Sequence, residues 1–197
     1  LFPYMRKNKK MKNLLSICFL LLTQYSFAQT TLFNKSIELN PDIQHEVGTT
    51  ILVESDGDIW IIGRTNNRYI EQTDSLVVLK MDKEGSYQWK QKYNINSVGE
   101  EFSRESVLLS DGSIIIGGTV QYQNINNNAF LLKLDSLGNE MWYQEYGDSY
   151  YQSIFDLKIT QDGGFIFGRR TDTPPLNGLD DAWLVKTDSL GNIEWEQ

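Results

Sequence analysis

The stretch Asp135-Ser-Leu-Gly138-Asn-Glu-Met-Trp142 decides the fold, because the same frame occurs three times in the chain. It appears earlier as Asp82-Lys-Glu-Gly85-Ser-Tyr-Gln-Trp89 and later as Asp188-Ser-Leu-Gly191-Asn-Ile-Glu-Trp195. The Asp, the Gly and the Trp each recur at a step of 53 residues. A period of this size is typical of repeat architectures, so the sequence predicts a fold built from repeated units.

Each repeat predicts four short strands. In the second repeat these are residues 106–110, 114–118, 129–133 and 140–146. An Asp-Gly pair between the first two strands, here Asp111-Gly112, supplies the positive φ that a hairpin turn needs. The second strand of each repeat is a continuous apolar run, which predicts a strand buried on both faces. Four antiparallel strands every ~50 residues predict an all-β, β-propeller-like fold.

The recurring frame also predicts a structural role for each of its three residues. The Asp can accept a backbone N–H at the start of a turn, and the Gly fits the left-handed position that follows. The Trp then falls on the fourth strand, where we expect it to cover the boundary with the neighbouring blade. The residues of this structural repeat are Asp82, Gly85, Trp89, Asp135, Gly138, Trp142, Asp188, Gly191 and Trp195.

The 53-residue pitch divides the chain into blades of residues 46–98 and 99–151 and an incomplete blade of residues 152–197. Residues 29–40 alternate polar and apolar side chains, which predicts a single strand that latches a ring. Closed propellers have about four to eight blades, so three blades form an incomplete ring. We expect completion by further sequence beyond Gln197, with self-association as the alternative.

Residues 1–28 are typical of a secretory signal peptide. A basic head at Met11-Lys-Asn precedes the apolar run 14–22, and the small residues Ser26 and Ala28 precede the expected cleavage site. Residues 1–10 are interpreted as an upstream extension. The apolar run is too short to cross a bilayer of ~30 Å, so we expect a secreted or cell-surface protein without membrane insertion of the mature chain. Cys18, the only cysteine, lies within this leader.

Charge excludes one class of partner. The leader carries five basic and no acidic residues, so the remaining residues hold 13 basic against 26 acidic side chains, a formal net charge of −13. A surface of this sign repels phosphate backbones, and nucleic acid is therefore a poor partner. We expect extracellular protein or polysaccharide as the partner instead.

The sequence offers no catalytic constellation, and we expect no enzymatic activity and no cofactor. His45 is the only histidine, which excludes a site with several histidine ligands, and we interpret it as a loop residue. Calcium is the alternative, with Asp56, Asp58, Asp180 and Asp181 as candidate oxygen ligands. Turn formation is the explanation that we favour for these aspartates, because it requires no bound ion.

The loops that differ between the repeats are the place where a ligand site, if the protein has one, is expected. The second such loop, residues 121–128, is rich in amides that can bond a sugar. The candidate ligand-binding residues are Arg68, Tyr69, Tyr122, Asn124 and Asn126. Solvated linkers are the interpretation that we favour for these segments, and a ligand site is the alternative.

Runs such as Asp162-Gly-Gly-Phe-Ile-Phe-Gly-Arg169, followed by Asp181-Ala-Trp-Leu-Val-Lys186, carry a resemblance over residues 46–197. The chain resembles the secreted propeller-type repeat proteins common in Bacteroidetes, which often end in a type IX secretion sorting domain. The sequence shows no such domain, which leaves the export route open. The Asp-x-x-Gly-x-x-x-Trp frame is also similar to the tryptophan-docking repeat of quinoprotein dehydrogenases, a likeness that we attribute to blade architecture alone.

The sequence therefore predicts a secreted or cell-surface, non-enzymatic β-propeller scaffold that binds protein or polysaccharide. One alternative is a hydrolase or lyase that acts on extracellular glycans, since paired carboxylates can be assembled across blades. Another alternative is a structural spacer within a longer adhesin.

Overall fold

The computed structural model describes residues 45–66, 74–94, 99–122, 127–147, 152–171 and 181–197, all within one compact unit. These ranges hold strands and no helix, so no helix among them could cross a membrane. The strands are β1 (His45–Val53), β2 (Ile59–Asn66), β3 (Asp74–Met81), β4 (Tyr87–Tyr93), β5 (Gly99–Leu108), β6 (Ile114–Tyr122), β7 (Asn127–Leu134), β8 (Glu140–Tyr146), β9 (Gln152–Ile159), β10 (Phe165–Thr171), β11 (Asp181–Thr187) and β12 (Ile193–Glu196).

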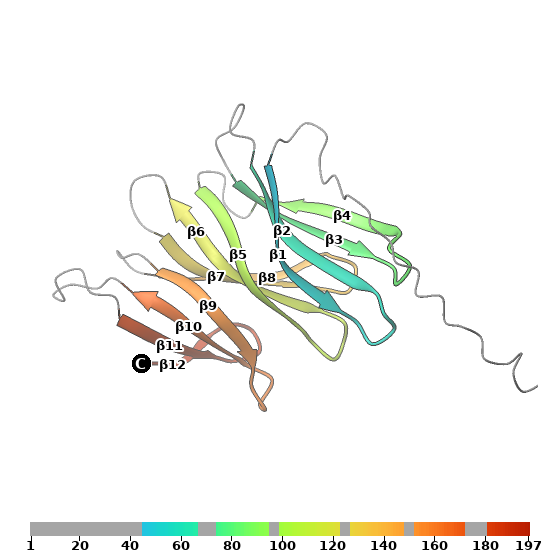
Figure 1. Ribbon diagram of the computed structural model, residues 1–197. Helices are drawn as coiled ribbons and strands as arrows, with labels where there is room; N and C mark the ends of the chain where they lie inside the picture. The colour runs from blue at the N-terminus through green and yellow to red at the C-terminus, as the bar shows by residue number, and fades with distance from the viewer. Residues whose placement is uncertain (1–44, 67–73, 95–98, 123–126, 148–151, 172–180) are drawn as a thin grey trace, which may run out of the picture. The chain divides into compact units, whose positions relative to one another are not determined.

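The strands form three four-stranded sheets, each an antiparallel meander of consecutive strands (Figure 1). The first sheet holds β1 to β4, the second β5 to β8 and the third β9 to β12. One sheet therefore corresponds to one 53-residue repeat, and the prediction of an all-β fold of repeated four-stranded units is confirmed. None of the three sheets closes on itself.

Two local expectations need correction. His45 is the first residue of β1 and pairs with Asn66, so its backbone belongs to a sheet and not to a loop. The second variable loop is shorter than predicted, because Gln121 in β6 pairs with Asn127 in β7. Ladder hydrogen bonds continue into both ends of the polar segment and satisfy its backbone groups there.

The apolar second strands bury their faces as the sequence predicts, most completely in the middle sheet. Ile114 and Ile116 of β6 contribute to a core shared with the first sheet. Ile115, between them, contributes to a core shared with the third sheet. Because successive side chains of a strand point to opposite faces, a strand between two packed sheets needs an unbroken apolar run.

The first core lies between the first and second sheets. Its buried members are Trp60, Ile62, Leu76, Val78, Tyr93, Ile114, Ile116, Val120, Phe130, Leu132 and Leu134. The second core lies between the second and third sheets. Its buried members are Ile115, Ala129, Leu131, Tyr146, Ile154, Leu157, Phe165, Phe167 and Val185. A third cluster joins Val77, Leu79 and Met81 on the other face of the first sheet.

The third sheet presents a different environment on its far face. Leu184 in β11 is 41% exposed, and Trp195 in β12 is 45% exposed. Trp195 pairs with Lys186 across the strands, as Trp142 pairs with Lys133 in the second sheet. In the second sheet, Leu131 and Trp142 pack against the third sheet. In the third sheet, Leu184 and Trp195 occupy the equivalent positions and are partly exposed.

Each first strand carries a β-bulge at the same place. The register between the first and second strands shifts at Thr49 in β1, at Arg104 in β5 and at Phe155 in β9. A bulge leaves one residue without an opposite partner and bends the strand, which re-aims nearby side chains. β1 contacts β5, and β5 contacts β9, so the first strands of the three sheets follow one another side by side (Figure 1).

Candidate functional site

The recurring turn holds its Asp and its Gly in the geometry that the sequence suggests. Asp135 Oδ1 accepts hydrogen bonds from the backbone N–H groups of Leu137 and Asn139, at 2.9 and 2.8 Å. Gly138 has a φ of +84°, a left-handed conformation that disfavours other residues. Hydrogen bonds from the side chain and then the backbone of Asn139 lower the pKa of Asp135. The Asp thus orders a turn.

The Trp of one repeat lies against the Gly of the next. A Cβ added at Gly138 would lie 2.6 Å from Cη2 of Trp89, in the preceding sheet. Trp142 stands in the same relation to Gly191, with Cζ3 at 3.1 Å from the added Cβ. The frame therefore joins two sheets, because its Trp covers one boundary while its Gly receives the Trp of the sheet before.

Two tyrosines strengthen this contact, a role that the sequence pattern did not predict. The hydroxyl of Tyr93 donates a hydrogen bond to the carbonyl oxygen of Gly138 at 2.5 Å, and Tyr146 does the same to Gly191 at 2.7 Å. Burial raises the pKa of both phenols, and nearby carboxylates add to the shift. The available signal was their spacing, because Tyr93 and Tyr146 are also 53 residues apart.

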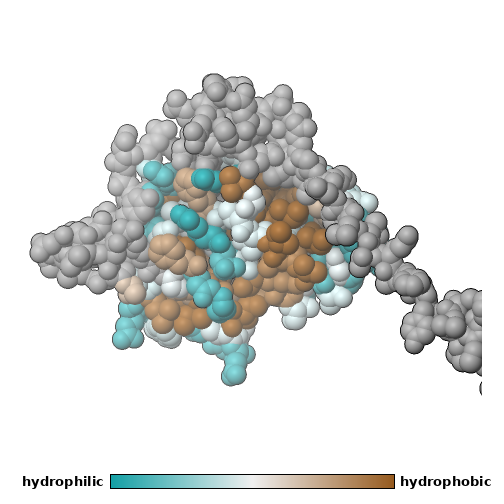
Figure 2. Space-filling model, in the orientation of Figure 1, coloured by the Kyte–Doolittle hydropathy of each residue, from teal (hydrophilic) through white to brown (hydrophobic). Residues whose placement is uncertain are grey.

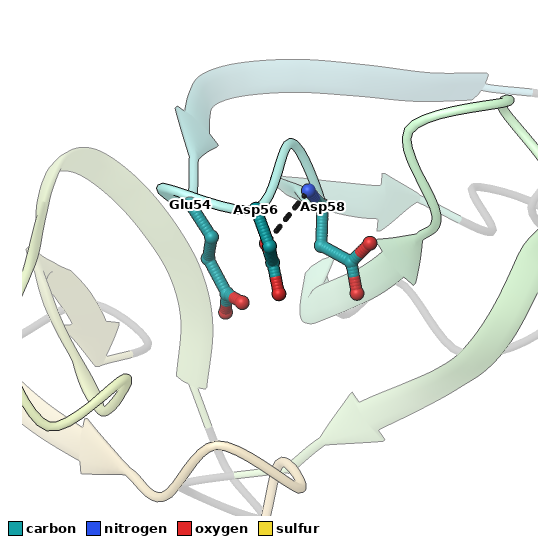
Figure 3. Close-up of side chains that lie close together, drawn as sticks. All are labelled: Glu54, Asp56 and Asp58. Atoms are coloured by element: carbon teal, nitrogen blue, oxygen red, sulfur yellow. Dashed lines mark hydrogen bonds between the residues drawn. The ribbon is translucent and has the colours of Figure 1, made fainter.

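The candidate calcium ligands fall into two groups. Asp56 and Asp58 lie together with Glu54 in the turn after β1, where one carboxylate oxygen from each lies within 4.8 Å of the others (Figure 3). Asp180 lies outside the described residues, as does the side chain of Asp181. The structure therefore adds Glu54 to the predicted pair and leaves the other pair untested.

Each carboxylate of this acidic turn already accepts a hydrogen bond. Glu54 Oε1 accepts from the Trp60 indole at 2.5 Å and from the Lys80 ammonium at 2.8 Å. Asp56 Oδ1 accepts the backbone N–H of Asp58, as Figure 3 shows, and Asp58 Oδ2 accepts from Gln88. These bonds are sufficient to explain why three acidic residues lie together.

Of the predicted ligand-loop residues, Tyr122 alone lies in the described part of the chain; Arg68, Tyr69, Asn124 and Asn126 lie outside it. The Tyr122 hydroxyl lies 2.9 and 2.8 Å from the two carboxylate oxygens of Glu145. Glu145 also accepts hydrogen bonds from Tyr143 at 2.6 Å and from Asn128 at 3.1 Å. Tyr122 is thus held within its own sheet by a carboxylate.

A pocket of about 540 Å³ lies where the three bulges meet. All three bulge residues, Thr49, Arg104 and Phe155, line it, so that each sheet contributes one. We call it the bulge pocket. In the orientation of Figure 1, the described surface of the protein presents hydrophilic and hydrophobic residues side by side (Figure 2). A volume of this size falls within the ~300–1,000 Å³ of typical ligand sites.

Pairs of hydroxyl groups from neighbouring sheets lie in contact in the lining of the bulge pocket. Thr49 Oγ1 of the first sheet lies 2.5 Å from Ser103 Oγ of the second. Thr119 Oγ1 of the second sheet donates to Ser153 Oγ of the third at 3.1 Å. Ser103, Thr119 and Ser153 are buried, so their positions are fixed by packing as well as by these bonds.

The bulge pocket also contains two arginines and two aromatic rings. The guanidinium carbon of Arg64 lies 4.5 Å from the ring centroid of Phe102, a cation–π geometry. Arg104 is exposed at its bulge, and Phe155 is 58% exposed. None of the described lining residues is acidic. The pocket therefore presents positive charge in a chain whose formal net charge is −8.

This pocket is not apparent from the sequence because the three bulge residues share no residue type, although each lies seven residues before the Asp of its Asp-Gly turn. Thr49, Arg104 and Phe155 occupy the same place in three repeats and are chemically unrelated. The available signal was this shared spacing, but that the position is a bulge becomes visible only once the strand register is known.

Comparisons with known proteins give no family for this chain. No protein-family model matches it, and no curated protein matches it.

Proposed function

We propose that this protein is a secreted or cell-surface scaffold of the β-propeller type that binds an extracellular polysaccharide at the bulge pocket. The leader-like residues 1–28 support export. Three consecutive four-stranded sheets of 53-residue pitch support an arrangement as successive propeller blades. The binding proposal rests on one observation, a ligand-sized pocket to which all three sheets contribute a bulge residue.

The chemistry of the bulge pocket favours recognition. Its lining offers hydroxyl groups, the amides of Gln121 and Asn127, guanidinium groups and aromatic rings. Hydroxyls and amides can both donate and accept hydrogen bonds, which suits the alternating donors and acceptors of a sugar. An exposed ring such as that of Phe155 offers an apolar face to the C–H groups of a sugar ring.

A glycan array with the purified protein tests this proposal. Selective binding that leaves the glycan chain length unchanged supports a scaffold, whereas release of shorter products supports the alternative of a hydrolase or lyase. Phe155→Ala removes an exposed ring from the bulge pocket and should abolish most binding. Leu190→Ala, at a residue that is 60% exposed in a turn outside the pocket, is the control and should bind as the wild type does. A lack of glycan binding would refute the proposal.

A further inference from the structure

We infer, on the basis of the proposed function, that the saccharide bound in the bulge pocket is built from sugar rings whose hydroxyl groups are all equatorial, as in β-linked glucose or xylose. In such a ring the hydroxyl groups project from the rim, and both faces consist of C–H groups. A ring with an axial hydroxyl carries a polar group on one face. The two kinds of ring therefore need different surroundings in a pocket.

The polar side chains of the pocket lining come chiefly from the second sheet, which packs between the other two. They carry hydroxyl, amide or guanidinium groups, all of which form hydrogen bonds with the hydroxyl groups of a sugar. We call these residues the polar floor: Ser103, Arg104, Thr119, Gln121 and Asn127. Ser103, Thr119 and Asn127 are buried, so packing holds a large part of the polar floor in place.

Two exposed apolar side chains of the lining come from the first and third sheets. Val47 in β1 is 45% exposed, and Phe155 on the bulge of β9 is 58% exposed. The first and third sheets pack on opposite faces of the second, and β1 and β9 each contact β5. Val47 and Phe155 therefore flank the polar floor, and we call them the two apolar walls.

The bulge itself does not explain the ring of Phe155. Thr49 and Arg104 hold the same place in the first and second sheets, so the bulge forms with a hydroxyl, a cation or an aromatic ring. A ring that is mostly exposed also contributes less to the core than a buried ring does. Contact with a ligand is a role that accounts for an aromatic side chain at this position.

A ring with equatorial hydroxyl groups matches both parts of the lining. Its rim can form hydrogen bonds with the polar floor, while its C–H faces contact the apolar walls and remove them from water. An axial hydroxyl turned towards Val47 or Phe155 would lose its hydrogen bonds to water and gain none, because neither side chain has a polar atom. A buried hydroxyl without a partner weakens binding by roughly 5- to 100-fold.

Titration calorimetry with matched hexasaccharides tests the inference. Cellohexaose and xylohexaose have only equatorial ring hydroxyls. β-1,4-Mannohexaose has the linkage of cellohexaose and differs from it only in the axial hydroxyl at C2 of each ring. We expect cellohexaose or xylohexaose to bind at least about fivefold more tightly than mannohexaose.

Val47→Thr adds a hydroxyl to one apolar wall at nearly constant volume. It should reduce the preference for cellohexaose over mannohexaose by roughly 2- to 10-fold, because an axial hydroxyl then finds a hydrogen-bond partner. Val53→Thr is the control, since it makes the same change on the same strand, at a residue that is 62% exposed and outside the pocket lining. The readout is a ratio of two affinities, which a partial loss of folded protein would not change.

The outcomes separate this inference from the proposed function. Equal affinities for cellohexaose and mannohexaose, both lost in Phe155→Ala, would overturn the inference and keep the scaffold proposal, as would tighter binding of mannohexaose. A preference for cellohexaose that Val47→Thr leaves unchanged would overturn the role of that wall. If no hexasaccharide bound while the glycan array showed another ligand, the inference alone would fall. A failure of every glycan to bind would overturn both.

Discussion

Trp89 and Gly138 are in contact across the boundary between two sheets. A Cβ at Gly138 would lie 2.6 Å from Cη2 of the indole and 2.9 Å from two further ring atoms, so the ring rests on the backbone of the turn. Tyr93, on the same strand as Trp89, donates its hydroxyl hydrogen to the carbonyl oxygen of the same glycine. The glycine is therefore needed both for its backbone conformation and for its missing side chain.

The first prediction separates these two requirements. Gly138→Ala should lower the free energy of unfolding by about 2–4 kcal/mol, because left-handed backbone costs an alanine about 1–2 kcal/mol and the collision with Trp89 adds to it. Urea unfolding of the purified variant measures the change.

Gly163→Ala is the matched control. Gly163 has nearly the same φ, +83°, but nothing lies within 4 Å of an added Cβ. It should lose only the backbone part, about 1–2 kcal/mol. Equal losses in the two variants would show that the indole contact contributes nothing.

The second prediction compares two tryptophans of the repeat. Trp142→Ala should destabilise the protein by about 3 kcal/mol or more, because this ring packs in the core between the second and third sheets, 6.1 Å from the Phe165 ring. Trp195→Ala should cost about 1 kcal/mol, since Trp195 is 45% exposed. Thermal unfolding measures both. A larger loss for Trp195 would contradict the assigned boundary role.

The turn of the frame could be predicted from the sequence because its Asp and its Gly each act within the turn. Asp135 supplies hydrogen bonds within its own turn, and Gly138 supplies a positive φ. Both depend on neighbours a few residues away, which a sequence displays directly. The role of Tyr146 depends on a carbonyl oxygen 45 residues further along the chain, in another sheet. Spacing alone marks such a residue but does not reveal its partner.

The bulge pocket could not be predicted for a related reason. A bulge is a property of strand register, and register is set jointly by two strands. Phe155 and Arg104 become neighbours of one pocket only when three first strands pack in order. The predicted loop residue Tyr122, in contrast, was recognisable as an aromatic in a polar segment, yet its hydroxyl is bonded to Glu145.

The third prediction concerns the buried tyrosines at high pH. Tyr146→Phe should cost about 1–2 kcal/mol at neutral pH, because the carbonyl oxygen of Gly191 loses a donor in a buried place. Burial raises the pKa of Tyr146 in the folded state, so the folded protein holds this proton more tightly than the unfolded chain does. The stability that depends on the neutral phenol is present below pH ~10, the ordinary tyrosine pKa, and is lost as pH rises above it.

Chemical unfolding between pH 8 and 11 measures this dependence. The wild type should lose stability above pH 10 more steeply than the double variant Tyr93→Phe, Tyr146→Phe, because burial raises the pKa of both phenols. If the free energy of unfolding fell equally steeply with pH in both proteins, the two buried tyrosines would not be the cause of the loss.

The fourth prediction concerns the turn aspartates at low pH. Hydrogen bonds from the side chain of Asn192, then from backbone N–H groups, lower the pKa of Asp188, and the same arrangement lowers that of Asp135. A lowered pKa means that the folded state favours the carboxylate, so the stabilisation is present above pH ~4 and is lost as pH falls below it. Asp135→Asn and Asp188→Asn together keep an oxygen acceptor in each turn but remove the titration.

The double asparagine variant should therefore unfold in urea with a smaller change in stability between pH 5 and pH 2 than the wild type. A second double variant with alanine at both positions should also lose stability at pH 7, since alanine leaves the turn N–H groups of Leu137 and Asn139 without their acceptor. If both double variants matched the wild type at pH 7, the Asp side chains would contribute nothing to the turns. The 53-residue repetition of Asp would then need a cause other than the turn.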